Sequence, residues 1–352
     1  MSSLQDTDDD LFGQRSKTGE NQPADARQPL HRPFVVPNCY PAISRYWAIA
    51  HARAITSTDR KAADYPGSGD PTGGFVNYVS RSVAASKGLA KVINGQVYIG
   101  TDNTTKISTS SQGRDSIRLE AKESFNQGLL VADIAHMPGN ACGIWPAFWT
   151  FNLDEDPYGE IDIIEGVMQQ PNNIVSLHTC GACSFDFSAS SGTDSRTNCN
   201  LGGESRGCSD EVVTNVDGCG NTGPSGSYGD KFNALGGGVY VTQVLTDTVK
   251  IWYFPKASIP ADLKAGTPDP SKWPAPFFNP QKSSRGCNVA NFFKKNSIII
   301  NITFCGAAVD QDTWDSVSTC KAKASTCNGF VAANPSAFSE AYWLFNSIKL
   351  YQ

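Results

Sequence analysis

The sequence lacks a long hydrophobic run, and it lacks an excess of basic residues. No stretch of its 352 residues approaches the apolar length that crosses a membrane, so we expect no membrane span. Lys and Arg total 29 against 34 Asp and Glu, which gives a formal net charge of -5. This acidic balance argues against nucleic acid as a partner.

The first part of the chain has few features that specify a packed fold. Met1–Arg32 is polar, is acidic at Asp8–Asp10, and lacks the basic and then apolar pattern of a secretory signal. Its composition predicts disorder. From about residue 70 onward the chain shows no linker, no internal repeat and little helical periodicity. We therefore expect an atypical, poorly ordered segment over residues 1–69 and one domain over residues 70–352.

Charged residues are also scarce, at 18%, whereas Gly (32 residues) and Pro (20 residues) are frequent. This composition is typical of many short strands joined by turns. Apolar runs of strand length recur along the domain, at Val239–Val244, Val249–Phe254 and Ser297–Phe304. The sequence therefore predicts an all-β domain.

The segment 159–166 places three carboxylates in an otherwise apolar, β-branched run, where an isolated buried charge is strongly disfavoured. On a regular strand Glu160 and Asp162 point to one face, whereas Glu165 points to the other. A β-bulge at the two isoleucines between Asp162 and Glu165 adds the one residue that brings all three acids to the same face. We expect this bulge, with the two outer carboxyls converging on one bond of a ligand.

Two carboxyls so placed are the equipment of a retaining glycosidase, whose nucleophile and acid lie roughly 5 to 5.5 Å apart. One of them must be ionised and the other protonated. An aspartate between them hydrogen-bonds the nucleophile, and its charge helps to keep a proton on a neighbouring glutamate. The plain alternative is an exposed strand with acids facing solvent. The alternating Ile161 and Ile163 favour a half-buried strand instead.

A second aromatic strand, Gly143–Phe151, precedes the acidic one and would lie beside it. It carries Trp145 and Trp149, which are far enough apart to serve two places in a groove. A sugar ring presents an apolar C–H face to a tryptophan, and the indole N–H can meet a hydroxyl. The alternative for either residue alone is packing in the core.

These motifs together resemble glycoside hydrolase family 16, in particular the fungal laminarinase-like endo-1,3(4)-β-glucanases. The resemblance runs from about Gly74 to Gln352, and its acidic motif is specific. The matching segments are Arg114–Arg118, Gly128–Ile134, Trp145–Phe151, Glu160–Gly166, Ser176–Thr179, Lys250–Pro255 and Ala341–Trp343.

The resemblance implies a role for each acid: Glu160 is the nucleophile, Glu165 the acid/base and Asp162 the assisting carboxylate. It places Trp145, Trp149 and His178 in substrate binding. For His178 the alternative is an ordinary structural histidine. It also implies a jelly-roll sandwich of two antiparallel sheets, with the three acids on the concave face that forms a substrate cleft.

The expected activity is hydrolysis of β-1,3 or mixed β-1,3/1,4 glucan by double displacement, with no cofactor and no metal. Two alternatives remain open: a transglycosylase on β-glucan and a non-catalytic glucan-binding protein. The intact acids favour catalysis, whereas the missing amino-terminal family strand supports binding alone. We expect a β-glucan as the partner and a monomeric protein.

The chain departs from the family in three places. It has Gln243–Val244 where relatives carry an acidic residue and then Trp, and Ala307–Val309 where an Asp-Trp pair is common. These changes put binding beyond the central subsites in doubt. Nothing before about Asp70 resembles the family's opening strand, which points to a damaged copy or a wrongly assigned gene start.

Cysteine usage predicts an extracellular or cell-wall protein. Ten of the eleven cysteines lie in the family-like region and can form five disulfides. The spacing of Cys180 and Cys183 fits a redox or metal site, but the surrounding patterns of such sites are missing. We expect a long, disulfide-stapled loop over Cys180–Ser227 that frames the cleft. Asn103 and Asn301 head candidate N-glycosylation motifs.

Overall fold

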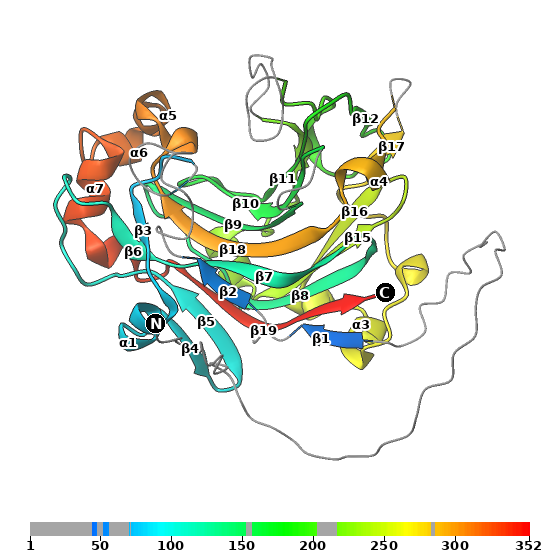
Figure 1. Cartoon of the computed structure of the whole chain (residues 1–352), viewed down its shortest axis with the longest axis horizontal. Coiled ribbons are helices and arrows are strands. Elements are labelled where there is room, and N and C mark those ends of the chain that lie inside the picture. Colours follow the sequence, from blue (N-terminus) through cyan, green and yellow to red (C-terminus); the bar gives the residue numbers. More distant parts are fainter. Residues whose placement is uncertain are drawn as a thin grey trace, which may run out of the picture.

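The computed structural model describes residues 44–47, 52–55, 70, 72–152, 157–202, 217–282 and 286–352. Two large antiparallel sheets lie face to face, and their strands curve together across the molecule (Figure 1). This confirms the predicted all-β sandwich of two antiparallel sheets. The helices of the described residues are all short, so each has too few residues for a clear 3.6-residue pattern, and the sequence did not predict them.

The first sheet follows the order β16-β15-β8-β19-β5-β4, and β1 also pairs with β19. Every pairing in it is antiparallel. Its strands are β1 (Ser44–Trp47), β4 (Ala90–Ile93), β5 (Gln96–Gly100), β8 (Gly128–His136), β15 (Gly238–Val244), β16 (Val249–Pro255) and β19 (Tyr342–Tyr351).

The second sheet has the order β13-β14-β11-β10-β9-β18-β7-β2 and contains both motif strands, β9 and β10, side by side. We call it the cleft sheet. Its strands are β2 (Ala52–Ile55), β7 (Arg118–Phe125), β9 (Ile144–Phe151), β10 (Gly159–Glu165), β11 (Ile174–Thr179), β13 (Thr193–Arg196), β14 (Cys219–Thr222) and β18 (Asn296–Phe304).

The main core lies between the two sheets. Phe148 of β9 contacts Phe345 of β19, with ring centroids 5.9 Å apart, and both are buried. Ile161 and Ile163 of β10 are fully buried in the same cluster. The core therefore takes one face of β9 and β10 and leaves the other face for the site.

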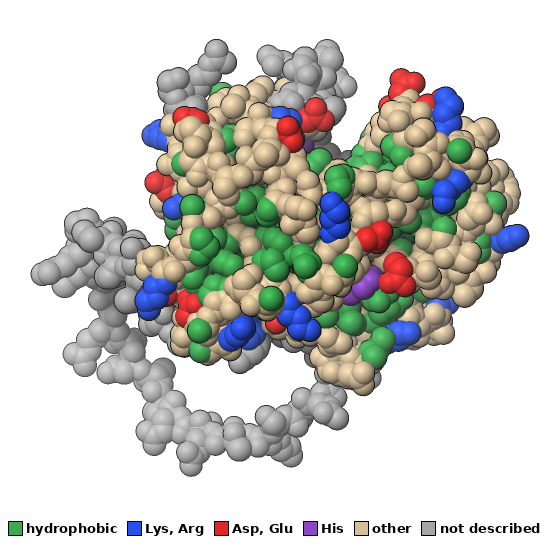
Figure 2. Space-filling model, turned by 180° about the vertical axis from the view of Figure 1, so that it is seen from behind, with side chains coloured by type: hydrophobic (Ala, Val, Ile, Leu, Met, Phe, Trp, Pro, Cys, Tyr) green, Lys and Arg blue, Asp and Glu red, His purple; other side chains and the backbone are tan. Residues whose placement is uncertain are grey.

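Shorter elements stand at the two ends of the cleft sheet (Figure 1). Helices α5 (Gln311–Ser316), α6 (Ser318–Lys321) and α7 (Cys327–Ala333) lie at one end, and the pair β12 (Phe185–Asp186) and β17 (Gln281–Lys282) at the other. The space-filling view shows the surface hollowed between two raised parts (Figure 2). The remaining strands and α-helices are β3 (Val76–Tyr78) with β6 (Arg114–Ser116), and α1 (Arg81–Ser86), α2 (Gly229–Ala234), α3 (Ala261–Ala265) and α4 (Val289–Phe292). Short 3-10 helices are η2 (Lys256–Ser258), η3 (Pro270–Lys272), η4 (Ala307–Val309) and η5 (Pro335–Phe338).

Two parts of the amino-terminal segment belong to the sheets. Strand β1 pairs with β19, and β2 pairs with β7 at the edge of the cleft sheet. The sequence did not predict these strands, because neither four-residue stretch has a strong alternating pattern. The rest of residues 1–69, apart from these strands, lies outside the described residues, so its predicted lack of order stays a prediction.

Disulfides join distant parts of the domain. Four are described: Cys142–Cys320, Cys183–Cys287, Cys199–Cys219 and Cys305–Cys327. Cys180 is disulfide-bonded as well, whereas Cys39 and Cys208 lie outside the described residues. Because Cys183 bonds Cys287, the two cysteines of Cys180–Cys183 do not form a redox pair with each other. In the part of the chain that is described, no helix has both the length and the apolar character to cross a membrane.

The stretch Cys180–Ser227 is more regular than the loop that the sequence predicted. It contains β13 and β14, and these two strands extend the cleft sheet beyond β11. Ladder hydrogen bonds thus order a sequence rich in Gly and Ser that has low intrinsic strand propensity. Residues 203–216 of this stretch lie outside the described residues.

Candidate active site

The site is built on the predicted bulge in β10. Against β9, Asp162 pairs with Trp149 while Ile164 pairs with the preceding Phe148, so Ile163 is the extra residue. The register against β11 shifts in the same interval. Consequently Ile163 and Ile164 are both fully buried, and the regular alternation of the strand is broken there. The bulge is confirmed.

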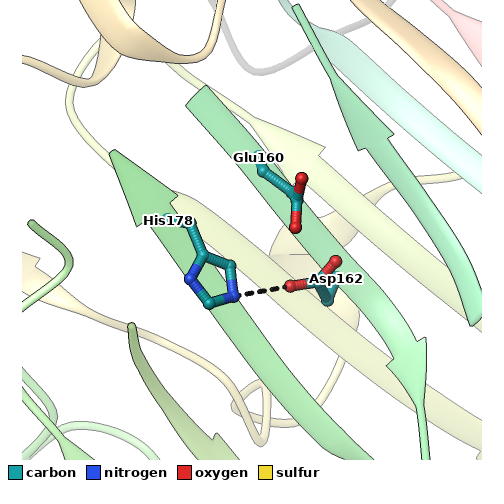
Figure 3. A group of neighbouring side chains, drawn as sticks. All are labelled: Glu160, Asp162 and His178. Carbon is teal, nitrogen blue, oxygen red and sulfur yellow. Dashed lines mark ion pairs between the residues drawn. The ribbon is translucent and has the colours of Figure 1, made fainter. Parts of the chain in front are cut away.

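Glu160 lies opposite His178 of β11 in the register, and Figure 3 shows both side chains on the same side of the sheet. The hydroxyl of Tyr158 donates a hydrogen bond to Glu160 Oε2. Burial, followed by the charge of Asp162, raises the pKa of Glu160 to about 8, while His178 and the Tyr158 bond oppose this rise.

Asp162 is the most buried of the three acids, with 4% of its surface exposed. His178 Nε2 lies 3.0 Å from its Oδ2 (Figure 3). Burial and the neighbouring charge of Glu165 raise the pKa of Asp162, and a hydrogen bond with Glu160 lowers it. Asp162 therefore stands in contact with both the Glu160 carboxyl and the histidine of the next strand.

Glu165 is held by Trp145, whose indole Nε1 donates to Oε1 over 2.7 Å. Its backbone N–H donates to Asn173 Oδ1 at 2.9 Å, which fixes the strand just after the bulge. Burial raises the pKa of Glu165, and the Trp145 bond, His178 and Arg196 oppose the rise. The indole thus holds the outer carboxyl on the cleft side of the strand.

The pKa values of the three carboxyls are shifted in the same direction. Each has a raised pKa, with burial as the main cause, so full ionisation of all three at once is disfavoured. Such a group holds protons that belong to the cluster as a whole. Chemically, the arrangement can keep one carboxyl protonated beside another that is ionised.

Trp149 is also engaged by protein groups. Its Nε1 donates to Asn301 Oδ1 over 2.7 Å, and the guanidinium of Arg118 lies 4.9 Å from the centre of its ring. Arg118 in turn pairs with Glu120 at 2.9 Å. The indole N–H groups of both tryptophans therefore donate to protein oxygens, and the expected contacts of these residues with sugar stay a prediction. Asn301 is buried, which argues against a glycan there.

Three residues at the site were not predicted from the sequence. Tyr158 precedes Glu160 by two positions, and the period of a strand alone would have placed both on one face. Arg118 reaches Trp149 from a strand two places along the sheet. Arg196 donates from Nη2 to Ser176 Oγ at 3.0 Å, and no local motif signals this contact because β13 was taken for loop.

The chain is similar to known proteins along most of its length. The model of the XgeA-like catalytic GH16 domain matches residues 64–351. The chain belongs to glycoside hydrolase family 16. A probable endo-1,3(4)-beta-glucanase of Aspergillus clavatus is 43% identical over 81% of this chain and 43% of its own length. Endo-1,3(4)-beta-glucanase of Arthroderma benhamiae is 42% identical over 80% of this chain and 60% of its own length. The chain thus spans less than two thirds of either relative.

Solved family 16 structures show the same fold. An elongating family 16 beta-1,3-glucosyltransferase is 39% identical, with a TM-score of 0.72 over 80% of this chain and 92% of the other. Laminarinase 16A from Phanerochaete chrysosporium, with beta-glucans in its donor and acceptor sites, is 33% identical, with a TM-score of 0.74 over 86% of this chain and 95% of the other.

Three side chains at the site could together supply ligand atoms to a metal ion. Single ligand atoms of Glu160, Asp162 and His178 all lie within 4.8 Å of one another. Each side chain already has a protein partner, since His178 pairs with Asp162 and Tyr158 bonds Glu160. These contacts engage all three side chains within the protein, and the expectation that no metal or cofactor is bound stays a prediction.

The departures from the family lie outside the acid cluster. Gln243 and Val244 belong to β15, in the sheet opposite the acids, and both are buried. Ala307–Val309 form a short 3-10 turn that follows β18. The doubt about outer subsites stays a prediction.

Proposed function

We propose that the protein is a retaining endo-β-glucanase that hydrolyses β-1,3 or mixed β-1,3/1,4 glucan by double displacement. The bulge carries this proposal, because it turns Glu160, Asp162 and Glu165 to one face while the isoleucines between them fill the core. The catalytic role of the three acids, and the substrate contacts of Trp145, Trp149 and His178, are part of the same proposal.

In the first step the ionised Glu160 attacks the anomeric carbon of the glucan. The bond from that carbon to the leaving oxygen breaks, and Glu165 gives its proton to this oxygen. The product is a glycosyl ester on Glu160 and a free sugar end. The contact with Asp162 supports the carboxylate of Glu160 before the attack.

In the second step Glu165, now ionised, takes a proton from water as the water oxygen attacks the same carbon. The ester bond to Glu160 breaks and the carboxylate returns. Two inversions retain the configuration of the sugar. Glu165 must therefore work in both protonation states, which suits a group whose pKa burial raises and whose Trp145 bond favours the charged form.

A second candidate is transglycosylation, in which a sugar hydroxyl replaces the water of the second step. The 39% identity to an elongating beta-1,3-glucosyltransferase favours it. Glucan binding without catalysis is the third reading. It requires that the acids be inert, and their convergence on one face argues against it.

Product analysis tests the three functions together. We expect laminarin and lichenan to be shortened to oligosaccharides, whereas xyloglucan serves as a comparison substrate. Products longer than the starting oligosaccharide would indicate transglycosylation. Glucan that is retained by the protein but unchanged in size would contradict both catalytic proposals.

We also propose that the protein works outside the cell as a monomer. The described disulfides support the first point, because such bonds persist in oxidising compartments. Fractionation of the source culture and light scattering of the pure protein test the two points. An intracellular pool alone, or a stable dimer, would contradict them.

A further inference from the structure

Tyr158 contacts Glu160, and double displacement by two carboxyls does not in itself require this contact. Its hydroxyl donates to Glu160 Oε2, the carboxylate that attacks. Its ring lies 6.3 Å from that of Phe151, which in turn stacks on Trp149 at 5.1 Å. The tyrosine thus stands between the aromatic side of the cleft and the Glu160 carboxylate.

The backbone around Tyr158 is fixed on both sides by one amide. Asn152 Nδ2 donates to the carbonyl of Pro157 at 2.8 Å, and its Oδ1 accepts from the N–H of Gly159 at 2.8 Å. Asn152 is itself buried and donates to the carbonyl of Phe292 at 3.1 Å. These bonds clamp the residues before and after the tyrosine.

Two further contacts complete the clamp. The carbonyl of Tyr158 accepts from the N–H of Cys180, a disulfide-bonded residue, at 3.2 Å. A Cβ on Gly159 would lie 2.1 Å from the carbonyl oxygen of Phe292, so this position has no room for a side chain. The chain here is ordered by close packing and hydrogen bonds, which is how side chains are preorganised at reactive sites.

We propose that Tyr158 is a positioning residue that orients the Glu160 carboxylate for attack. The inference rests on the proposed function, in which Glu160 is the nucleophile. Tyr158 acts through Glu160 alone, by holding one carboxylate oxygen so that the other faces the anomeric carbon. No atom of the tyrosine takes part in bond making or breaking.

The charges around Glu160 explain why such a donor is needed. Asp162 and Glu165 on its own strand repel its negative charge, and His178 on β11 attracts it. Burial adds the largest obstacle to ionisation, so the pKa of Glu160 rises to about 8. The Tyr158 bond lowers it. Burial and the Glu160 charge raise the pKa of Tyr158 itself, so its hydroxyl keeps the proton that it donates.

Tyr158→Phe tests the proposal by removing one hydroxyl and leaving the ring. Loss of a hydrogen bond to a charged group predicts a fall in kcat of about 10- to 100-fold on laminarin, with little change in KM. Because Glu160 then ionises less readily, the acid limb of the pH profile of kcat/KM should move to higher pH. An unchanged rate and an unchanged pH profile would overturn the inference.

Tyr253→Phe is the matched control. The Tyr253 hydroxyl donates to the carbonyl of Gly226 at 2.7 Å, from β16 in the sheet opposite the acids. Its loss likewise removes one hydrogen bond of a tyrosine hydroxyl but leaves the acids untouched. We expect wild-type kcat, KM and pH profile. A fall that equals the one in Tyr158→Phe would mean that loss of any tyrosine hydroxyl explains the effect.

A double variant separates positioning from a purely structural role. In Glu160→Ala, azide can attack in place of the missing carboxylate. If Tyr158 acts only through Glu160, then adding Tyr158→Phe to Glu160→Ala should leave the azide-supported rate unchanged. A further 10-fold fall in that rate would overturn the inference. Wild-type hydrolysis by Glu160→Ala would instead overturn the proposed function, so the two failures are distinguishable.

Discussion

The two faces of β10 differ in the chemistry and in the burial of their side chains. The core face carries Ile161, Ile163 and Ile164, all fully buried, whereas the cleft face carries three carboxyls with raised pKa values. A single inserted residue, Ile163, serves both faces, because it keeps the core filled while it returns Glu165 to the cleft. Stability and chemistry thus depend on separate side chains of one strand.

Glu160→Ala, on the cleft face, should reduce catalytic activity more than any other substitution considered. We expect hydrolysis of laminarin to fall at least about 10⁴-fold, since the nucleophile acts as one unit with the other acids. Azide or formate should restore turnover and give a product of inverted configuration. Steady-state rates and NMR of the product check this. Retained configuration in the azide product would exclude Glu160 as the nucleophile.

Glu165→Ala should have a smaller effect that depends on the leaving group. Natural glucans need a proton on the leaving oxygen, so their cleavage should slow by about 10²- to 10⁴-fold. Activated aryl glycosides need no such proton and should form the glycosyl-enzyme at nearly the normal rate. Comparing the two substrates measures the difference. Hydrolysis of laminarin at the wild-type rate would rule out Glu165 as the acid.

Ile161→Ala addresses the core face of the same strand. Truncation of a fully buried isoleucine should lower the free energy of unfolding by roughly 2 to 5 kcal/mol. The rate per folded molecule should stay close to that of the wild type, because the acids keep their partners. Denaturant unfolding and activity well below the transition check both parts. A large loss of kcat with unchanged stability would show that the two faces are not separate.

Asp162→Asn should reduce catalytic activity least among the substitutions of the three acids. The charge of Asp162 raises the pKa of Glu160, so its removal should lower that pKa and move the acid limb of the activity profile to lower pH. The lost contact to Glu160 should reduce kcat by about 2- to 10-fold. Rates measured across about pH 4 to 9, a range that includes both the ordinary pKa of a glutamate and the raised pKa of Glu160 of about 8, test both effects. An acid limb that moves to higher pH would contradict this electrostatic account.

The sequence was sufficient for features that depend on local pattern. The bulge followed from the odd spacing of Glu160 and Glu165, and the strands β15, β16 and β18 followed from apolar runs. Contacts across strands depend on register, which the sequence alone did not supply. For this reason the pairing of Trp149 with Asn301 and the place of Arg196 emerged only from the structure. The two-residue period of a strand, which placed Asp162 on the face of Glu160, could have placed Tyr158 there as well.

We propose above all that Glu160 is the nucleophile on the cleft face of the bulged strand, and covalent trapping tests this role most directly. A 2-deoxy-2-fluoro laminaribioside with a good leaving group should inactivate the protein by forming a slowly hydrolysed ester. Digestion and mass spectrometry should then find the label on Glu160 alone. A label on Asp162 or Glu165, or full turnover without any covalent adduct, would contradict the account.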